Sequence, residues 1–79
     1  MFNQTKLEEL SEQINAMGFY PFIRDGILFV SAENGDDAAD YYGEFRGGYV
    51  WINPKLKDLA KKNTAFWEWQ NPGCIGLFQ

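Results

Sequence analysis

Apolar residues recur near the start of the chain at the spacing of one helical face: Leu7, Leu10, Ile14 and Met17. This pattern predicts a helix over residues 5–17. Thr5 and Glu8 have the spacing of a capping box, in which the Thr5 hydroxyl accepts a backbone N–H and Glu8 reaches back to the cap. Gly18 is expected to end the helix in the left-handed conformation.

The next two segments, 19–24 and 27–32, are rich in aromatic and β-branched residues and flank Asp25-Gly26. A two-residue Asp-Gly loop favours a type I′ turn, so the pattern predicts a β-hairpin. Pro21 has no N–H to donate, which indicates that the first strand lies at an edge or begins after this residue. The nearly continuous apolar run of the second strand indicates a central strand or one covered on both faces.

A second helix is predicted to begin at Asn53-Pro54, because Asn caps helices well and Pro is tolerated at the first helical position. Its lysines would face water, and Asn63 would end it. Residues 66–70 and 74–78 then predict a second hairpin, in which Trp67 and Trp69 alternate with polar neighbours as on a half-buried strand.

Residues 36–44 allow two interpretations. Asp36 could cap a short helix that Gly43 ends, or residues 41–45 could pair as a strand with residues 49–52 across Arg46-Gly47-Gly48. In the helical alternative Asp36, Asp40 and Glu44 would lie on one face, where like charges destabilise each other.

Taken together, these elements predict one α+β domain over residues 1–79, with two helices packed on a four- or five-stranded antiparallel sheet. The two ends of the chain match in outline, since each has a capped helix followed by two strands. Residues 7–10 echo residues 56–59, and Gly26 and Gly73 hold the same place in the two turns. The sequence therefore predicts an αββ pseudo-repeat with residues 33–52 inserted between the halves.

Composition excludes several kinds of chemistry. The 79 residues include one Cys and no His, so an internal disulfide, a Cys/His zinc site and catalysis by an imidazole base are excluded. No segment has the charge and apolar pattern of a signal peptide or the length of a membrane span, which predicts a cytoplasmic protein that does not enter a membrane. The net charge of −4 argues against direct binding of nucleic acid.

Charge is distributed unevenly along the chain. Residues 1–54 hold nine acids and three bases, a net −6, whereas residues 55–79 hold two acids and four bases, a net +2. The segment 33–44 carries five acids and no Lys or Arg. Its candidate partner-binding residues are Glu33, Asp36, Asp37, Asp40, Tyr41, Tyr42 and Glu44. Carboxylates one helical turn apart lie about 6 Å from each other, close to the phosphate spacing of a nucleic-acid strand.

Other chemical interpretations of the chain are weaker. The acidic segment lacks the alternating ligands and the final Glu of an EF-hand loop, and no metal or other cofactor is expected. A domain this small has little room for a substrate cleft, so no enzymatic activity is expected. Phe66, Trp67, Trp69 and Phe78 could stack on bases, but a core role is favoured because a small domain needs their area inside. Cys74 is expected to be a small buried hydrophobe.

In its length, its lack of catalytic residues and its acidic, Tyr-bearing segment 33–44, the chain resembles small inhibitors encoded by phages and mobile elements, the anti-CRISPR proteins in particular. The resemblance is one of kind and rests on no shared motif. It implies a role in the host cell cytoplasm and, for members that imitate nucleic acid, binding to a basic channel of a Cas complex. The basic stretch 55–62 departs from a wholly acidic mimic.

These observations lead to two hypotheses. In the first, the chain is a non-enzymatic inhibitor whose acidic segment blocks a nucleic-acid-binding site on a basic target protein. In the second, it is a small accessory or structural domain that forms a homodimer through a strand edge or an aromatic patch. The chain is expected to be a monomer or a weak dimer, and a monomer would favour the first hypothesis.

Overall fold

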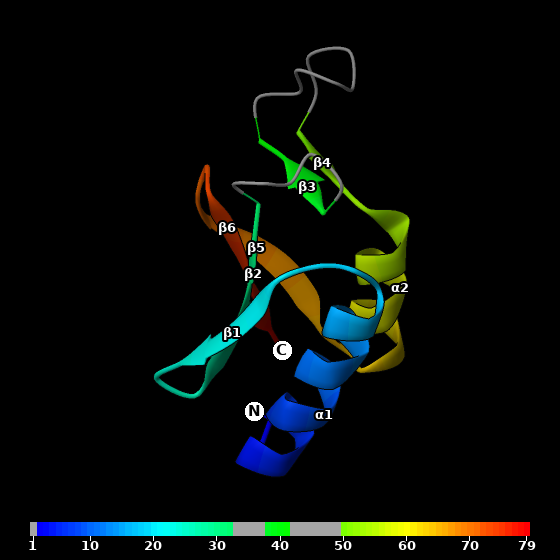
Figure 1. The fold of residues 1–79 in the computed structure, drawn as a ribbon, viewed down its shortest axis with the longest axis vertical. Coiled ribbons are helices and arrows are strands. Elements are labelled where there is room, and N and C mark those ends of the chain that lie inside the picture. The colour runs from blue at the N-terminus through cyan, green and yellow to red at the C-terminus, as the bar shows by residue number, and fades with distance from the viewer. Residues whose placement is uncertain (1, 33–37, 42–49) are drawn as a thin grey trace.

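The computed structural model describes residues 2–32, 38–41 and 50–79 (Figure 1). The elements follow one another in the order α1 (Gln4–Ala16), β1 (Pro21–Arg24), β2 (Ile27–Ser31), β3 (Ala39–Asp40), β4 (Trp51–Ile52), α2 (Pro54–Lys62), β5 (Phe66–Asn71) and β6 (Cys74–Phe78). Within these described residues, two helices and a four-stranded antiparallel sheet make up most of the α+β fold, and β3 and β4 form a separate two-stranded sheet.

The first helix begins one residue earlier than the sequence predicted, because a different residue caps it. The side chain of Asn3 accepts the backbone N–H of Lys6 at 2.8 Å and satisfies one of the free donors of the first turn. The predicted capping box of Thr5 and Glu8 is therefore wrong. Thr5 lies inside the helix, and the carboxylate of Glu8 accepts from the Gln4 side chain at 3.1 Å.

Both helices end in the same hydrogen-bonded motif. In α1 the N–H of Phe19 donates to the carbonyl of Ile14, and Gly18 has a φ of +94°. In α2 the N–H of Ala65 donates to the carbonyl of Ala60, and Thr64 has a φ of +54°. These bonds define Schellman motifs with one residue in the left-handed region. The predicted left-handed role of Gly18 is confirmed.

The predicted first hairpin is also confirmed. Asp25 and Gly26 have φ values of +53° and +74°, as a type I′ turn requires, and β1 pairs antiparallel with β2. The strand order β1-β2-β6-β5 places β1 at an edge and β2 in the interior of the sheet. Pro21 is tolerated at an edge because it has no N–H to donate to a further strand.

The second helix and hairpin lie where the sequence placed them. The Asn53 side chain accepts the backbone N–H of Lys55 at 2.9 Å, Pro54 occupies the first turn, and Asn63 is the C-cap. Strands β5 and β6 pair antiparallel, with a register irregularity between Trp69 and Asn71.

The sheet register supports the αββ pseudo-repeat. Pro21, Phe22 and Ile23 pair with Val30, Phe29 and Leu28 in one hairpin, and Trp67, Glu68 and Trp69 pair with Leu77, Gly76 and Ile75 in the other. The two hairpins meet through β2 and β6, where Phe29 pairs with Gly76. Phe29 and Gly76 are equivalent positions, so a local two-fold axis runs between them. The match of residues 7–10 with residues 56–59 was shifted by one helical turn. When the ends of the two helices are aligned, Leu10 corresponds to Leu56.

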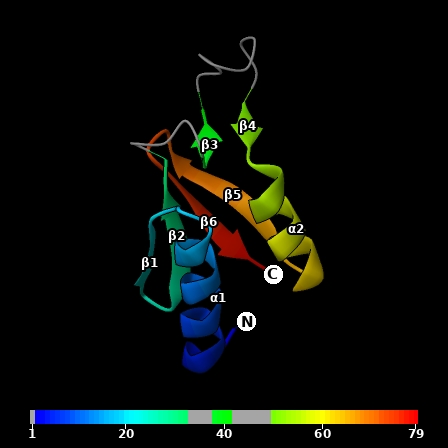
Figure 2. The same cartoon turned by 45° about the vertical axis from the view of Figure 1, so that its right-hand side comes forward.

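The main core lies between the helices and one face of the sheet (Figure 2). Each helix contributes three fully or nearly buried apolar side chains, which pack with the sheet residues Leu28, Val30, Ile75 and Leu77. Those four residues alternate along β2 and β6 and share a face by register. Trp67 and Trp69 lie on the same face and pack against this core.

The inserted region contributes a small antiparallel pair above the main sheet (Figure 1). Ala39 pairs with Ile52 and Asp40 with Trp51, and Ala38 and Ala39 are buried in the core. The helical alternative is therefore wrong for residues 38–41. The hairpin alternative correctly placed the partner strand within residues 49–52, but it started the pairing at residue 41. The pairing begins at Ala39 because burial of Ala38 and Ala39 fixes the register. Residues 42–49 lie outside the described part of the chain. Among the described residues, no helix is long and apolar enough to cross a membrane.

Candidate functional site

The acidic segment predicted from the sequence is described only at Asp40 and Tyr41. The other candidate residues lie outside the described part of the chain: Glu33, Asp36, Asp37, Tyr42 and Glu44. Asp40 and Tyr41 stand at the end of β3, where the insertion is attached to the core through Ala38 and Ala39.

Asp40 and Tyr41 differ in their exposure. Asp40 keeps only 8% of its surface exposed, so it offers a partner little contact area. Tyr41 keeps 40%, and its ring packs edge-on against Trp69 with the centroids 5.2 Å apart. An edge-to-face aromatic contact stabilises one arrangement of a ring without covering all of it. Tyr41 therefore presents a partly exposed ring that is packed against the domain on one side.

The two tryptophans of β5 are held in different ways. The indole Nε1 of Trp67 donates to the carbonyl of Leu56 at 2.7 Å, which ties β5 to α2. The Nε1 of Trp69 is buried, and no acceptor for it lies among the described residues. The expectation of a core role holds for both tryptophans, since both are half-buried against the core.

The opposite face of the sheet carries a row of phenylalanines, two of which, Phe66 and Phe78, were expected in the core. Phe22 stacks on Phe29 with the ring centroids 5.3 Å apart, and Phe66 lies 6.2 Å from Phe78. Phe22 and Phe66 remain 37% and 51% exposed. Both described helices pack on the other face, so we call these four residues the aromatic row of the open face. The expected core role of Phe66 is wrong.

The centre of the open face is Gly76. A Cβ atom there would lie 3.0 Å from Phe78 Cε2 and 3.1 Å from Phe29 Cε1. The two rings therefore close over the glycine and join the pairs from the two hairpins into one surface. Arg24 lies over the Phe22 ring at 5.8 Å from its centroid, and Glu68 is exposed on the edge strand at the other side. The alternation of Phe66 and Glu68 with Trp67 and Trp69 was the sequence signal for this surface.

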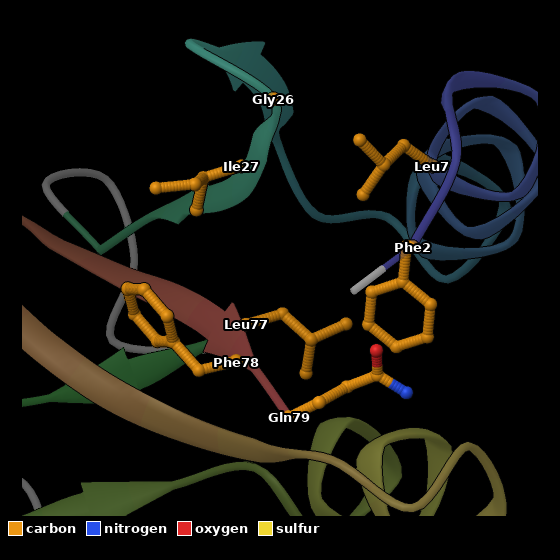
Figure 3. A pocket seen from close by; sticks show the side chains of 7 residues that line it. All are labelled: Phe2, Leu7, Gly26, Ile27, Leu77, Phe78 and Gln79. Carbon is orange, nitrogen blue, oxygen red and sulfur yellow. The ribbon is translucent and has the colours of Figure 1, made fainter.

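An apolar pocket of about 220 Å³ opens at the lower end of the domain. Its lining comes from three regions that are distant in sequence, namely the start of α1, the hairpin turn of β1 and β2, and the end of β6 (Figure 3). The lining residues are Phe2, Leu7, Gly26, Ile27, Leu77, Phe78 and Gln79. Among these described lining residues only Gln79 carries a polar side chain, so they offer few groups that could orient a ligand.

The lysines of α2 divide between two grooves. Lys57 and Lys61 line a groove of about 260 Å³ between α2 and β5. Lys55 and Lys62 line another groove that faces α1 and includes Asp58. The lysine face predicted to be solvated is thus exposed, but its two sides differ, because among the described lining residues a carboxylate, that of Asp58, is found only in the groove that faces α1.

Cys74 is half-buried on β6 and has a free thiol, so the expected full burial is not reached. Within residues 2–32, 38–41 and 50–79, no three His, Cys, Asp or Glu side chains form a group that could hold a metal ion.

The fold and these surfaces define a small α+β domain with an exposed aromatic face and a basic groove. Comparison of the chain with models of protein families, with curated proteins and with solved structures finds no match.

Proposed function

We propose that this chain is a non-enzymatic inhibitor that binds a basic target protein through its acidic, Tyr-bearing segment 33–44 and blocks the target's nucleic-acid-binding site. The resemblance in kind to anti-CRISPR proteins makes a guide-RNA-loaded Cas complex the first target to examine. Complementary charge would speed the encounter with such a target and select it over neutral surfaces.

The observation that carries this proposal is the placement of Tyr41. Its ring is fixed against Trp69 yet keeps 40% of its surface exposed, at the point where the acidic segment joins the core. Tyr gives large contact area at a low entropic cost, and a ring that is already fixed loses little freedom on binding. Asp40 is buried, so Tyr41 and the other acids of segment 33–44 would make the contact with the target.

The test measures inhibition of DNA binding by a panel of purified guide-RNA-loaded Cas complexes. The double variant Asp36→Lys with Asp37→Lys should weaken inhibition at least tenfold, and raising the salt concentration should weaken inhibition by the unaltered chain. Asp40 is left unchanged because altering a buried carboxylate would disturb the fold.

The matched control is Glu9→Lys with Glu12→Lys on α1, where both side chains are exposed and the change in charge is the same. Inhibition by this control should stay within about twofold of the unaltered chain. Equal weakening by the two double variants, or no inhibition of any complex in the panel, would refute the proposal.

Homodimerisation is the second candidate, and the aromatic row of the open face favours it. Exposed apolar patches of this kind mark interaction sites on soluble proteins. Four strands about 4.8 Å apart and about five residues long present roughly 300 Å² of face, well below the roughly 800 Å² per partner of a standard interface. The dimer would therefore be weak.

Sedimentation velocity over a wide concentration range tests the second candidate. Phe22→Lys with Phe66→Lys should leave only monomer, whereas Val50→Lys, at a residue that is exposed away from the aromatic row, should not change the association. A monomer at every concentration of the unaltered chain would exclude this function.

A further inference from the structure

The two edges of the main sheet differ in how well they are protected against another strand. Edge strand β1 has four residues, begins with Pro21 and ends with Arg24. Edge strand β5 has six residues and contains neither Pro nor Lys. Short length, Pro and charged residues, Lys above all, discourage strand addition at an edge. The charged residue of β5 is Glu68, which lies on the open face away from α2, and the irregularity of this strand comes near its end, at Gln70.

A groove runs beside this unprotected edge. Its lining residues come from α2, β5, Ala65 just before β5, and β4, and enclose about 260 Å³: Ile52, Lys57, Ala60, Lys61, Ala65, Phe66 and Trp67. Ala60 and Ala65 are small, so the groove has room for a side chain between the helix and the strand. Trp67 is fixed there by its hydrogen bond to the Leu56 carbonyl, so the apolar wall is formed in advance.

The groove is also positively charged. Lys57 and Lys61 are exposed, stand four residues apart on α2 and line the same wall. Asp58, the acid of α2, lines the groove on the other side of the helix. No acidic residue is among the described residues that line the β5 groove. Two like charges at this spacing destabilise a helix, and a bound anion would reverse that effect.

From these features we infer that the groove between α2 and β5 binds an extended acidic peptide segment of a partner protein. The segment adds to the β5 edge as a further strand, which supplies main-chain hydrogen bonds. One apolar side chain enters the space beside Ala60, Ala65 and Trp67, and carboxylates two residues before and after it meet Lys57 and Lys61. This surface is distinct from the acidic segment, and its role does not depend on the proposed inhibition.

The test uses a synthetic heptapeptide in which four threonines alternate with glutamate, valine and glutamate. The full-length ¹⁵N-labelled chain is titrated with it, and amide shifts and fluorescence anisotropy are recorded. Saturable shifts should concentrate at residues 66–71 of β5 and along α2. A peptide with lysines in place of the glutamates should bind at least tenfold more weakly. A peptide with N-methylated backbone amides should also bind at least tenfold more weakly, since it cannot donate hydrogen bonds to the β5 edge.

Matched double variants separate the groove from general attraction between opposite charges. Lys57→Glu with Lys61→Glu should weaken binding at least tenfold, while Lys55→Glu with Lys62→Glu, the same change on the other side of α2, should weaken it less than threefold. Equal weakening of binding by the two double variants, or equally tight binding of the lysine or N-methylated peptide, would overturn the inference. Amide shifts confined to β1 or the open face would also overturn it. So would a lack of saturation below 5 mM peptide, a concentration that corresponds to a binding free energy on the order of −3 kcal/mol.

Discussion

The unit formed by α1, β1 and β2 and the unit formed by α2, β5 and β6 share one backbone plan and expose different chemistry. Each has an Asn-capped helix, a Schellman motif and an antiparallel hairpin in matching register. In the N-terminal unit Pro21 protects the edge strand β1. The residue equivalent to Pro21 in the C-terminal unit is Trp67, which lines the basic groove.

The two units differ in features that depend on single side chains and agree in features that follow from the shared backbone arrangement. Equivalent core positions such as Leu28 and Ile75 are both fully buried. Equivalent positions on the open face differ, since Phe29 of the N-terminal unit corresponds to Gly76, and the Phe29 ring fills the space above that glycine. The shared backbone arrangement therefore determines the core positions, while different residues at equivalent positions of the open face give each unit a different surface.

The largest expected effect comes from the core positions that the two units share. Leu28→Ala and Ile75→Ala should each lower the free energy of unfolding by about 2–5 kcal/mol, because each leaves a cavity at a fully buried site. Urea denaturation in a stabilising osmolyte keeps both variants measurable. If one variant were nearly neutral, the two units would not share one core.

The next effect tests the close packing over Gly76. Gly76→Val should lower the free energy of unfolding by about 1–3 kcal/mol, because its side chain would meet the Phe29 and Phe78 rings. The second substitution Phe29→Ala in the same chain should recover part of the loss, and a double-mutant cycle measures the coupling. If the effects of the two substitutions on the free energy of unfolding were fully additive, the Phe29 ring would move away from a side chain at position 76 at no cost.

A smaller effect is expected from exchanging the residues that end the two helices. Thr64→Gly should stabilise the protein by about 1 kcal/mol, because a β-branched residue is strained at a φ of +54°. Gly18→Thr should destabilise it by about 1–2 kcal/mol for the same reason, at a φ of +94°. Thermal unfolding of both variants checks the pair. A loss of stability in Thr64→Gly would show that the threonine side chain contributes more than its strain costs.

The smallest effect concerns the helix caps. Asn3→Ala and Asn53→Ala should each cost about 1 kcal/mol, since each removes the acceptor for a backbone N–H of the first turn. Asn→Asp at the same positions should retain most of the stability because Asp caps equally well. Chemical denaturation provides the measurement. If Thr5→Ala cost as much as Asn3→Ala, the capping-box assignment at Thr5 would have to be restored.

Much of the fold could be predicted because its signals are local. The Asp25-Gly26 turn, the Asn53-Pro54 helix start and the alternation of Trp67 and Trp69 each specify their own segment. The cap of α1 was assigned incorrectly because Asn3 and Thr5 are both good caps, and only the helix geometry distinguishes them. Of the predicted site, Asp40 and Tyr41 alone lie in the described structure, and the inhibitory role of the acidic segment stays a prediction.

The sequence by itself determined the two helices, the two hairpins, the α+β class and the uneven distribution of charge, because spacing, turn chemistry and composition act over a few residues. Only the tertiary structure decided which side chains lie on which face. Phe66 is exposed and Trp67 is packed against the core although they are neighbours, because the sheet has helices on one face. The groove beside β5 likewise exists only once α2 lies against the edge strand, since its wall comes from segments that meet through folding.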